Sequence, residues 1–189
     1  MSHWTEREAR RLSKAQILLK PAVEGQAGIW ADLGCGDGIF TYLLAVLLQP
    51  GSQIYAIDKN RRSLQALERN LLGLKLPVVI QPMLADFTRP LALPPLDGLV
   101  LANSLHFVKQ KQPVLARLVD LLGPGGRLVL VEYNTGQGNY AVPHPLDETQ
   151  FLALADAVGL QQAQIVSRAP STFLGEMYTG LALAGTSHQ

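Results

Sequence analysis

The most restrictive feature of this sequence is a glycine-rich turn, DLGCGDG at residues 32–38, which separates a strand-like segment from a helix-like one. Glycines at alternate positions let the backbone turn sharply and approach a ligand with no Cβ in the way. The helix that follows points its free N–H groups at whatever occupies the turn. This order predicts a βα unit with a ligand site at the carboxyl end of its strand.

Apolar segments with strand and helix periodicity alternate along the rest of the chain. Strands are predicted at residues 28–33, 53–57, 78–84, 96–102, 127–133, 164–167 and 178–184, and helices at 39–48, 61–72, 113–122 and 147–158. Five such alternations imply a parallel sheet with helices on both faces. Only about ten residues join the last two strands, too few for a helical crossover, so these strands are expected to pair antiparallel.

The length and composition fit one compact domain over residues 1–189, since 48% of the residues are apolar and no linker or repeat interrupts them. Residues 1–25 are expected to form an N-terminal helical segment, because Trp4, Leu12, Ile17 and Leu18 give it an amphipathic pattern. This segment serves either as a small lid or as packing on the sheet edge. The sequence does not choose between them.

Several kinds of protein are excluded by simple counts. The single cysteine, Cys35, excludes a disulfide framework and any multi-cysteine metal site. The net charge of +1 gives no general case for a nucleic acid or an anionic membrane as partner. The longest apolar run, residues 43–48, is too short to cross a bilayer, and no secretory signal opens the chain. The expectation is a cytoplasmic protein, monomer or homodimer.

The acidic residues near the glycine turn indicate which ligand it takes. Asp58 ends the second predicted strand, where an acid can accept both hydroxyls of a ribose. Asp32 and Asp37 lie in the turn itself, where their carboxylates would repel a pyrophosphate. S-adenosylmethionine satisfies both conditions, because it has a ribose, an ammonium and a sulfonium centre but no phosphate.

The stretch WADLGCGDGIFTYLLA at residues 30–45 resembles the first motif of class I S-adenosylmethionine-dependent methyltransferases. The resemblance spans about residues 28–184 and continues through YAID (55–58), LADF (84–87), LDGLVLANSLHFV (96–108) and LGPGGRLVLVEY (122–133). It implies an α/β fold, a three-layer αβα sandwich with a seven-stranded, mostly parallel sheet. The strand order would be 3-2-1-4-5-7-6, with strand 7 antiparallel.

The resemblance also implies a set of cofactor-binding residues. They are Asp32, Gly34, Cys35, Gly36, Gly38, Asp58, Lys59, Asp86, Phe87, Asn103 and Ser104. The glycines match the loop around the methionine moiety, Asp58 matches the ribose-binding acid, and Asp86 matches the residue that contacts the adenine amino group. Asn103 and Ser104 match the stretch that faces the sulfonium end. Asp86 as a plain turn residue and Phe87 as a core residue stay open as alternatives.

Methyl transfer requires an aligned acceptor, and it requires a general base only for some acceptors. His106 follows the fourth predicted strand and is a candidate base, with the alternative that it only orients a helix. Tyr140 lies in a long irregular loop and is a second candidate, unless it is simply a surface residue. No pair of potential metal ligands has helical or turn spacing, and no metal is predicted.

The resemblance implies a small-molecule methyl acceptor, with S-adenosyl-L-homocysteine as the second product. The Asn/Asp-Pro-Pro-aromatic motif of many DNA, RNA and protein amino-methyltransferases is replaced by Asn103-Ser104-Leu105-His106. The alternatives are a catalytically silent S-adenosylmethionine-binding scaffold, an RNA or protein methyltransferase, and a nucleotide-binding oxidoreductase. Residues 128–167 contain acidic side chains but no Lys or Arg. They form either an ordinary solvated face or the border of a pocket for a neutral or cationic acceptor.

Overall fold

A computed structural model describes residues 6–186 of the chain, with side chains from residue 9 onward. The strands are β1 (Ile29–Leu33), β2 (Gln53–Asp58), β3 (Val79–Leu84), β4 (Leu96–Ala102), β5 (Leu122–Tyr133), β6 (Gln161–Ser171) and β7 (Gly175–Leu183). The helices are α1 (Glu6–Val23), α2 (Ile39–Leu47), α3 (Arg61–Leu71), α4 (Lys111–Val119) and α5 (Glu148–Ala157), with a short 3-10 turn, η1 (Leu105–Phe107).

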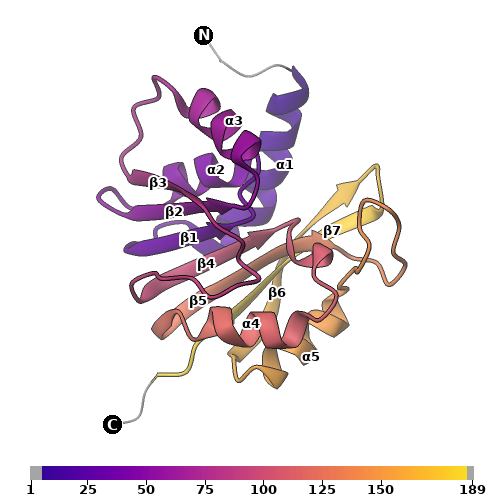
Figure 1. Cartoon of the computed structure of the whole chain (residues 1–189). Helices are drawn as coiled ribbons and strands as arrows, with labels where there is room; N and C mark the ends of the chain where they lie inside the picture. Colours follow the sequence, from indigo (N-terminus) through magenta and orange to yellow (C-terminus); the bar gives the residue numbers. More distant parts are fainter. Residues whose placement is uncertain (1–5, 187–189) are drawn as a thin grey trace.

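All seven strands form one sheet in the order β3-β2-β1-β4-β5-β7-β6 (Figure 1). The pairs among β1 to β5 are parallel, and β7 runs antiparallel to both β5 and β6. The implied topology is therefore confirmed, including the antiparallel pairing that the short last connection predicted. Pro82 lies in β3, which is an edge strand, where a missing N–H donor is tolerated.

The helices cover both faces of the sheet because successive strand residues point to opposite sides. On one face, Trp30, Val100 and Val129 pack with α1 and α2, and a smaller cluster packs under α3. On the other face, Leu99 and Leu128 pack with α4 and α5. Each strand of the centre is thus apolar on both sides, as expected of a parallel sheet that is covered twice.

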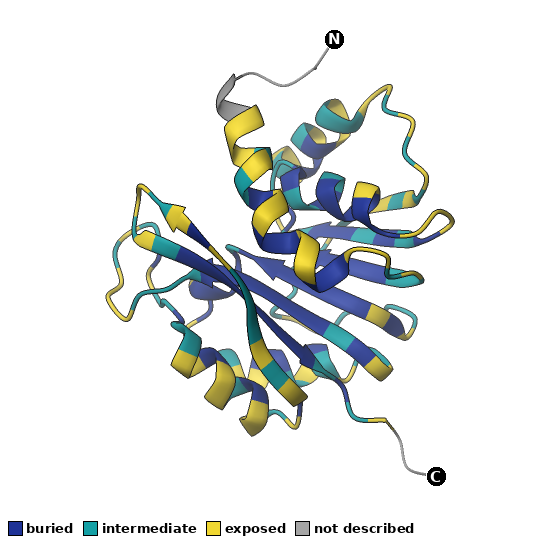
Figure 2. Cartoon of the chain, turned by 180° about the vertical axis from the view of Figure 1, so that it is seen from behind, coloured by how far each residue is buried: buried dark blue, intermediate teal, exposed yellow. Residues whose placement is uncertain are grey.

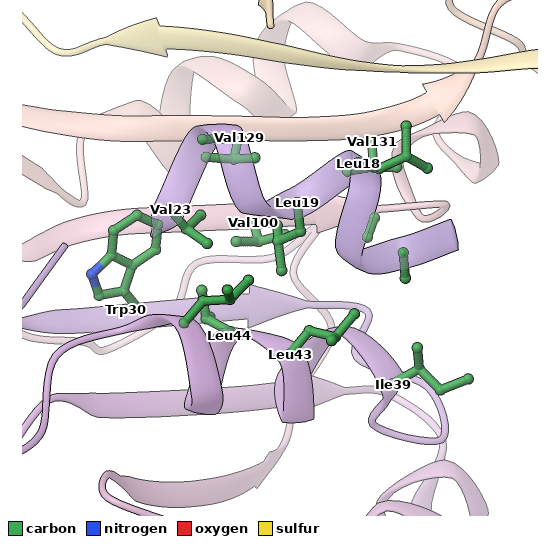
Figure 3. Close-up of a cluster of buried hydrophobic side chains, with 14 of the residues drawn as sticks. Leu18, Leu19, Val23, Trp30, Ile39, Leu43, Leu44, Val100, Val129 and Val131 are labelled. Carbon is green, nitrogen blue, oxygen red and sulfur yellow. The ribbon is translucent and has the colours of Figure 1, made fainter. Parts of the chain in front are cut away.

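Helix α1 packs its apolar side onto the sheet and against α2. Figure 2 shows it crossing the strands with its exposed side outward, and Figure 3 shows Leu18, Leu19 and Val23 beside Leu43 and Leu44 of α2. These leucines are at most 3% exposed. The C-terminal half of α1 is therefore part of the core. Trp4 and the rest of residues 1–5 lie outside the described residues, as do residues 187–189.

Two stretches differ from the sequence-based prediction. Helix α4 ends at Val119, and β5 begins at Leu122 because Leu122 pairs with Leu96 ahead of an irregularity in the ladder. The final strands are longer than predicted and form a hairpin whose turn comprises only residues 172–174. The edge strand β6 is mostly half-exposed, so its side chains show no clear alternation that sequence could reveal.

Candidate functional site

The glycine turn is held against the end of β2 by its own backbone. The N–H groups of Gly34 and Cys35 both donate to the carbonyl oxygen of Ile57, at 2.8 and 3.0 Å. The N–H of Gly36 donates to Oδ2 of Asp58 at 3.0 Å, and the N–H of Asn60 donates to Oδ1 at 2.8 Å. The Asp58 carboxylate therefore fixes the turn and its own loop at once.

Two of the glycines are required by the shape of this turn. Gly34 has a φ of +79°, and a Cβ there would lie 2.7 Å from the Cβ of Ser104. The hydroxyl of Ser104 in turn donates to the carbonyl oxygen of Leu33 at 2.8 Å, which locks β4 to β1. Gly36 has a φ of +56°, and a Cβ there would meet nothing within 4 Å, so this glycine presents bare backbone to open space.

A cavity of about 680 Å³ lies at the carboxyl ends of β1, β2 and β4. Eight of the predicted cofactor-binding residues line it, namely Gly34, Gly36, Asp58, Lys59, Asp86, Phe87, Asn103 and Ser104. The sequence-based prediction missed five further lining residues, Asn60, Ser63, Thr88, Phe107 and Val108. Asn60, Thr88 and Phe107 directly follow predicted residues or the candidate base, and this adjacency was the available signal for them. The structure therefore brings the main predicted set together in one place.

Asp58 and Asp86 are the carboxylates that line this cavity. Oδ1 of Asp86 accepts hydrogen bonds from the backbone N–H and the hydroxyl of Thr88, at 2.9 and 2.7 Å. Burial acts to raise the pKa of Asp86, but the Thr88 hydrogen bonds and the charges of Lys59 and Arg89 outweigh it and lower the pKa. Asp86 is accordingly an anion at neutral pH.

Asp32 and Asp37 lie elsewhere, which changes the charge argument made from the sequence. Asp32 is 1% exposed, and its Oδ2 accepts from the Thr41 hydroxyl at 2.6 Å. Burial raises the pKa of Asp32 to about 7, with Thr41 opposing the shift and Asp58 adding to it. Asp37 points toward α1 and pairs with Arg11 at 2.9 Å. Neither lines the cavity, so the negative charge there comes from Asp58 and Asp86.

Cys35 and Gly38 lie on the side of the turn that packs against α3. The Cys35 side chain packs with Ala56, Leu64 and Leu67, and burial raises the pKa of its thiol well above the usual range. A Cβ at Gly38 would lie 2.8 Å from Cγ of Leu67, so this glycine leaves room for α3. The side chain of Cys35 does not reach the cavity, and its binding role stays a prediction for the backbone alone.

Two cavities lie at this end of the sheet, the one of 680 Å³ and a second one of about 780 Å³, and neither candidate base lines either of them. His106 is 2% exposed, and its Nδ1 lies 2.6 Å from Oε2 of Glu132, a fully buried carboxylate that the sequence did not single out as its partner. The backbone N–H of His106 donates to Oε1 of Glu132 at 3.1 Å. Tyr140 is 94% exposed. This geometry fits the alternatives given above, an orienting histidine and a surface tyrosine.

The second of these cavities, of about 780 Å³, lies between α1, the β6–β7 hairpin and the ends of β4 and β5. It is lined by Arg10, Arg11, Lys14, Ala15, Leu18, Ile39, Phe40, Asn103, Tyr133, Ser171, Thr172, Phe173 and Met177. The rings of Tyr133 and Phe173 meet edge to face, with centroids 5.7 Å apart. Burial raises the pKa of Tyr133, nearby Glu132 adds to the shift, and Arg11 opposes it.

Asn103 lines both cavities and is the residue they share. Its φ is +53°, a left-handed conformation that is uncommon outside glycine. Its Oδ1 is buried and has no hydrogen-bond partner among residues 6–186. Backbone strain and an unpaired buried oxygen both cost free energy, and such features cluster at functional sites. Both of these costly features are therefore found at Asn103, where the two cavities meet.

Comparison with known proteins agrees with this geometry. Residues 31–128, just over half of the 189 residues, match the family described as "Methyltransferase domain". The chain belongs to the class I S-adenosylmethionine-dependent methyltransferase family. The matched residues begin in β1 and end in β5, and they include every residue of the 680 Å³ cavity.

Relatives of the chain include trans-aconitate 2-methyltransferase of Sinorhizobium fredii, 30% identical over 150 residues, which are 79% of this chain and 51% of that protein. Carboxy-S-adenosyl-L-methionine synthase of Aeromonas salmonicida is 33% identical over 104 residues, 53% of this chain and 42% of that protein. The methyltransferase chain therefore spans about half, or less, of the length of these relatives.

The solved structure of N-methyltransferase NodS from Bradyrhizobium japonicum WM9, in complex with S-adenosyl-L-homocysteine, has the same fold. Its TM-score is 0.70 at 19% identity, covering 96% of this chain and 89% of that one. In residues 6–186, no helix has the length and hydropathy to cross a membrane. Over the same residues, no three His, Cys, Asp or Glu side chains gather as metal ligands would.

Proposed function

We propose that this protein binds S-adenosylmethionine in the 680 Å³ cavity and transfers its methyl group to a small molecule in the 780 Å³ cavity. The observation that carries the proposal is that the two cavities share Asn103. A methyltransferase needs its two substrates in separate sites that meet at one point, since the acceptor must approach the methyl carbon in line with the departing sulfur.

The lining of the first cavity fits this cofactor. Asp58 offers carboxylate oxygens to a ribose, and Asp86 and Phe87 offer an acceptor and a ring to the adenine. Gly34 and Gly36 expose backbone to the methionine part, with Asn103 and Ser104 at the sulfonium end. Lys59 is the one basic side chain among the described lining residues, whereas a pyrophosphate would meet two carboxylates. The lining therefore favours a cationic ligand over a dinucleotide.

The chain's own residues act by positioning. When bound, S-adenosylmethionine supplies an electrophilic methyl carbon and a good leaving group. Alignment of an acceptor within reach can contribute about 7–11 kcal/mol through effective molarity, without a nucleophilic residue on the protein. The buried carboxylate of Glu132 holds His106 and thereby the turn after β4, which carries Asn103 and Ser104. His106 therefore acts as a positioning residue.

The assignment of a small-molecule acceptor is supported by the concave shape of the second cavity and by the relatives named trans-aconitate 2-methyltransferase. A small acceptor can enter this cavity between α1 and the β6–β7 hairpin. These observations favour it over a nucleic acid or protein substrate.

The test is a calorimetric titration of the protein with S-adenosyl-L-homocysteine and with NAD⁺, followed by measurement of S-adenosyl-L-homocysteine formation from S-adenosylmethionine with a panel of small acceptors. Binding of S-adenosyl-L-homocysteine, no binding of NAD⁺ and acceptor-dependent turnover are expected. A preference for NAD⁺ would contradict the proposal. Binding without turnover on any acceptor would favour the scaffold alternative.

A further inference from the structure

The walls of the second cavity are not alike in charge. One wall is formed by α1 and carries Arg10, Arg11 and Lys14, while the described lining residues include no Asp or Glu. The part formed by β5 and the β6–β7 hairpin carries Tyr133, Phe173 and Met177, beside the hydroxyl groups of Ser171 and Thr172. Such a division fits a ligand that is anionic at one end and apolar at the other.

We propose that the methyl acceptor is a small organic anion, a carboxylate or a phosphate, whose charged group is bound by Arg10, Arg11 and Lys14 of α1. Its apolar part lies against Tyr133 and Phe173, and its methyl-accepting atom lies at Asn103. This proposal rests on the proposed function and names the substrate class for that same site.

The three cations lie on one side of α1 by helical spacing. Lys14 lies four residues after Arg10 and three residues after Arg11, so both arginines are neighbours of Lys14 on the helix surface. Lys14 is only partly exposed, and it has no ion-pair partner among the described side chains, residues 9–186. Arg11 has Asp37 at 2.9 Å, which neutralises part of its charge and leaves net positive charge on this wall.

The aromatic wall gives the ligand an apolar surface beside these charges. Tyr133 ends β5 next to the shared Asn103 region, and Phe173 comes from the hairpin turn, where it is 48% exposed. Their edge-to-face contact closes one side of the cavity. Arg11 is near enough to Tyr133 to oppose the rise of its pKa, so charge and ring face the same space.

Most of the acidic side chains of residues 128–167, which suggested a cationic acceptor as one alternative, make contacts within the fold. Glu132 is buried against His106, and Asp147 caps α5, where its side chain accepts from the N–H of Gln150. Glu148 forms a two-point ion pair with Arg168, with both distances 2.7 Å. None of these carboxylates lines the cavity. These carboxylates therefore do not border a pocket for a cationic acceptor, and the charged side chains that line the cavity are Arg10, Arg11 and Lys14.

The experiment uses four aromatic probes of similar size: benzoate, phenyl phosphate, benzamide and benzylamine. Each is titrated into the full-length protein, with and without saturating S-adenosyl-L-homocysteine, and binding is followed by ligand-observed NMR. The variants are Arg10→Gln and Lys14→Gln, and the matched control is Lys20→Gln, an exposed lysine of the same helix that pairs with Glu24 and is absent from the lining.

At least one anion should bind about tenfold more tightly than benzamide, the scale of one hydrogen bond to a charged group. Arg10→Gln and Lys14→Gln should remove most of this preference, while Lys20→Gln keeps it. Benzoate against phenyl phosphate distinguishes the two anion classes. Equal binding of benzamide or benzylamine, no binding of either anion, or an unchanged preference in both cavity variants would overturn the proposal.

The same titrations separate this proposal from the one on which it rests. The affinity for S-adenosyl-L-homocysteine should be unchanged in the α1 variants, since neither residue lines the first cavity. If S-adenosyl-L-homocysteine binds and the anions do not, the anionic acceptor is wrong and the proposed function stands. If the anions bind and S-adenosyl-L-homocysteine does not, the proposed function fails and the bound anion is not a methyl acceptor.

Discussion

Nδ1 of His106 lies 2.6 Å from Oε2 of Glu132, and the other oxygen of the same carboxylate accepts the backbone N–H of His106. Both side chains are at most 3% exposed. A carboxylate at the end of β5 thus holds the short turn η1, which follows β4 and contributes to the first cavity. This link connects the core of the sheet to the site.

The first prediction concerns this buried pair. Glu132→Ala removes the buried partner of the His106 backbone N–H and of its ring atom Nδ1, and a buried polar group that is left unpaired costs about 1–3 kcal/mol. Glu132→Gln keeps one acceptor oxygen and should lose clearly less free energy of unfolding. Urea denaturation followed by circular dichroism measures both. Equal losses for the two variants would show that the contacts to His106 contribute little.

The second prediction concerns Asp58. Replacement by Ala should weaken the binding of S-adenosyl-L-homocysteine by about 1–3 kcal/mol, because hydrogen bonds to a charged group are lost. Asp58→Asn keeps an acceptor for one backbone N–H and tests the charge separately. The control is Asp156→Asn, on the exposed side of α5. Calorimetry that gives wild-type affinity for Asp58→Ala would show that the ribose assignment is wrong.

The third prediction compares two glycines of the same turn. A Cβ at Gly34 would meet Ser104 at 2.7 Å, whereas a Cβ at Gly36 meets nothing within 4 Å. Both φ angles are positive, so each alanine carries a backbone cost of about 1–2 kcal/mol. Gly34→Ala should therefore lower the melting temperature more than Gly36→Ala. The reverse order would mean that the Gly34–Ser104 contact is easily relaxed.

The fourth prediction concerns pH. The folded-state pKa of Asp32 is raised from 3.8 to about 7, so the folded protein holds a proton that the unfolded chain has released. The contribution of Asp32 to stability should therefore fall as pH rises from about 4 to about 7, by at most about 1.4 kcal/mol per pH unit. Above that range it should level off.

Asp32→Asn isolates this effect, because the amide oxygen can still accept from the Thr41 hydroxyl but cannot ionise. The difference in the free energy of unfolding between wild type and variant, measured by denaturant titration at several pH values, should slope in this window only. Parallel curves for the two proteins would mean that the pKa of Asp32 in the folded protein is ordinary.

Much of the fold was accessible from sequence because its signals are local. The period of most apolar segments and the glycine turn act within a few residues, and both are confirmed. The caps of α3 and α5, formed by the side chains of Asn60 and Asp147, are also local. The edge strand β6 and the start of β5 were misjudged, since their pairing is set by distant partners such as Leu96. Periodicity carries no information about those partners.

The features of the site also divide into those that the sequence predicts and those that it does not. Residues at the carboxyl ends of strands, such as Asp58 and Asn103, were predictable because parallel strands end at one edge of the sheet. The direction in which a carboxylate of the glycine turn points was not predictable from the sequence. Asp32 faces Thr41 and Asp37 faces Arg11, a partner 26 residues away. Arg10, Arg11 and Lys14 can be seen in the sequence, but their place beside the second cavity depends on how α1 packs on the sheet.

The most direct test of the account is an experimentally determined structure of the protein with S-adenosyl-L-homocysteine. The ribose should lie at Asp58, the adenine between Asp86 and Phe87, and the sulfur should face Asn103, where the second cavity opens. A ligand bound in another part of the molecule, or a sulfur directed away from Asn103, would contradict the claim that the two cavities form one methyl-transfer site.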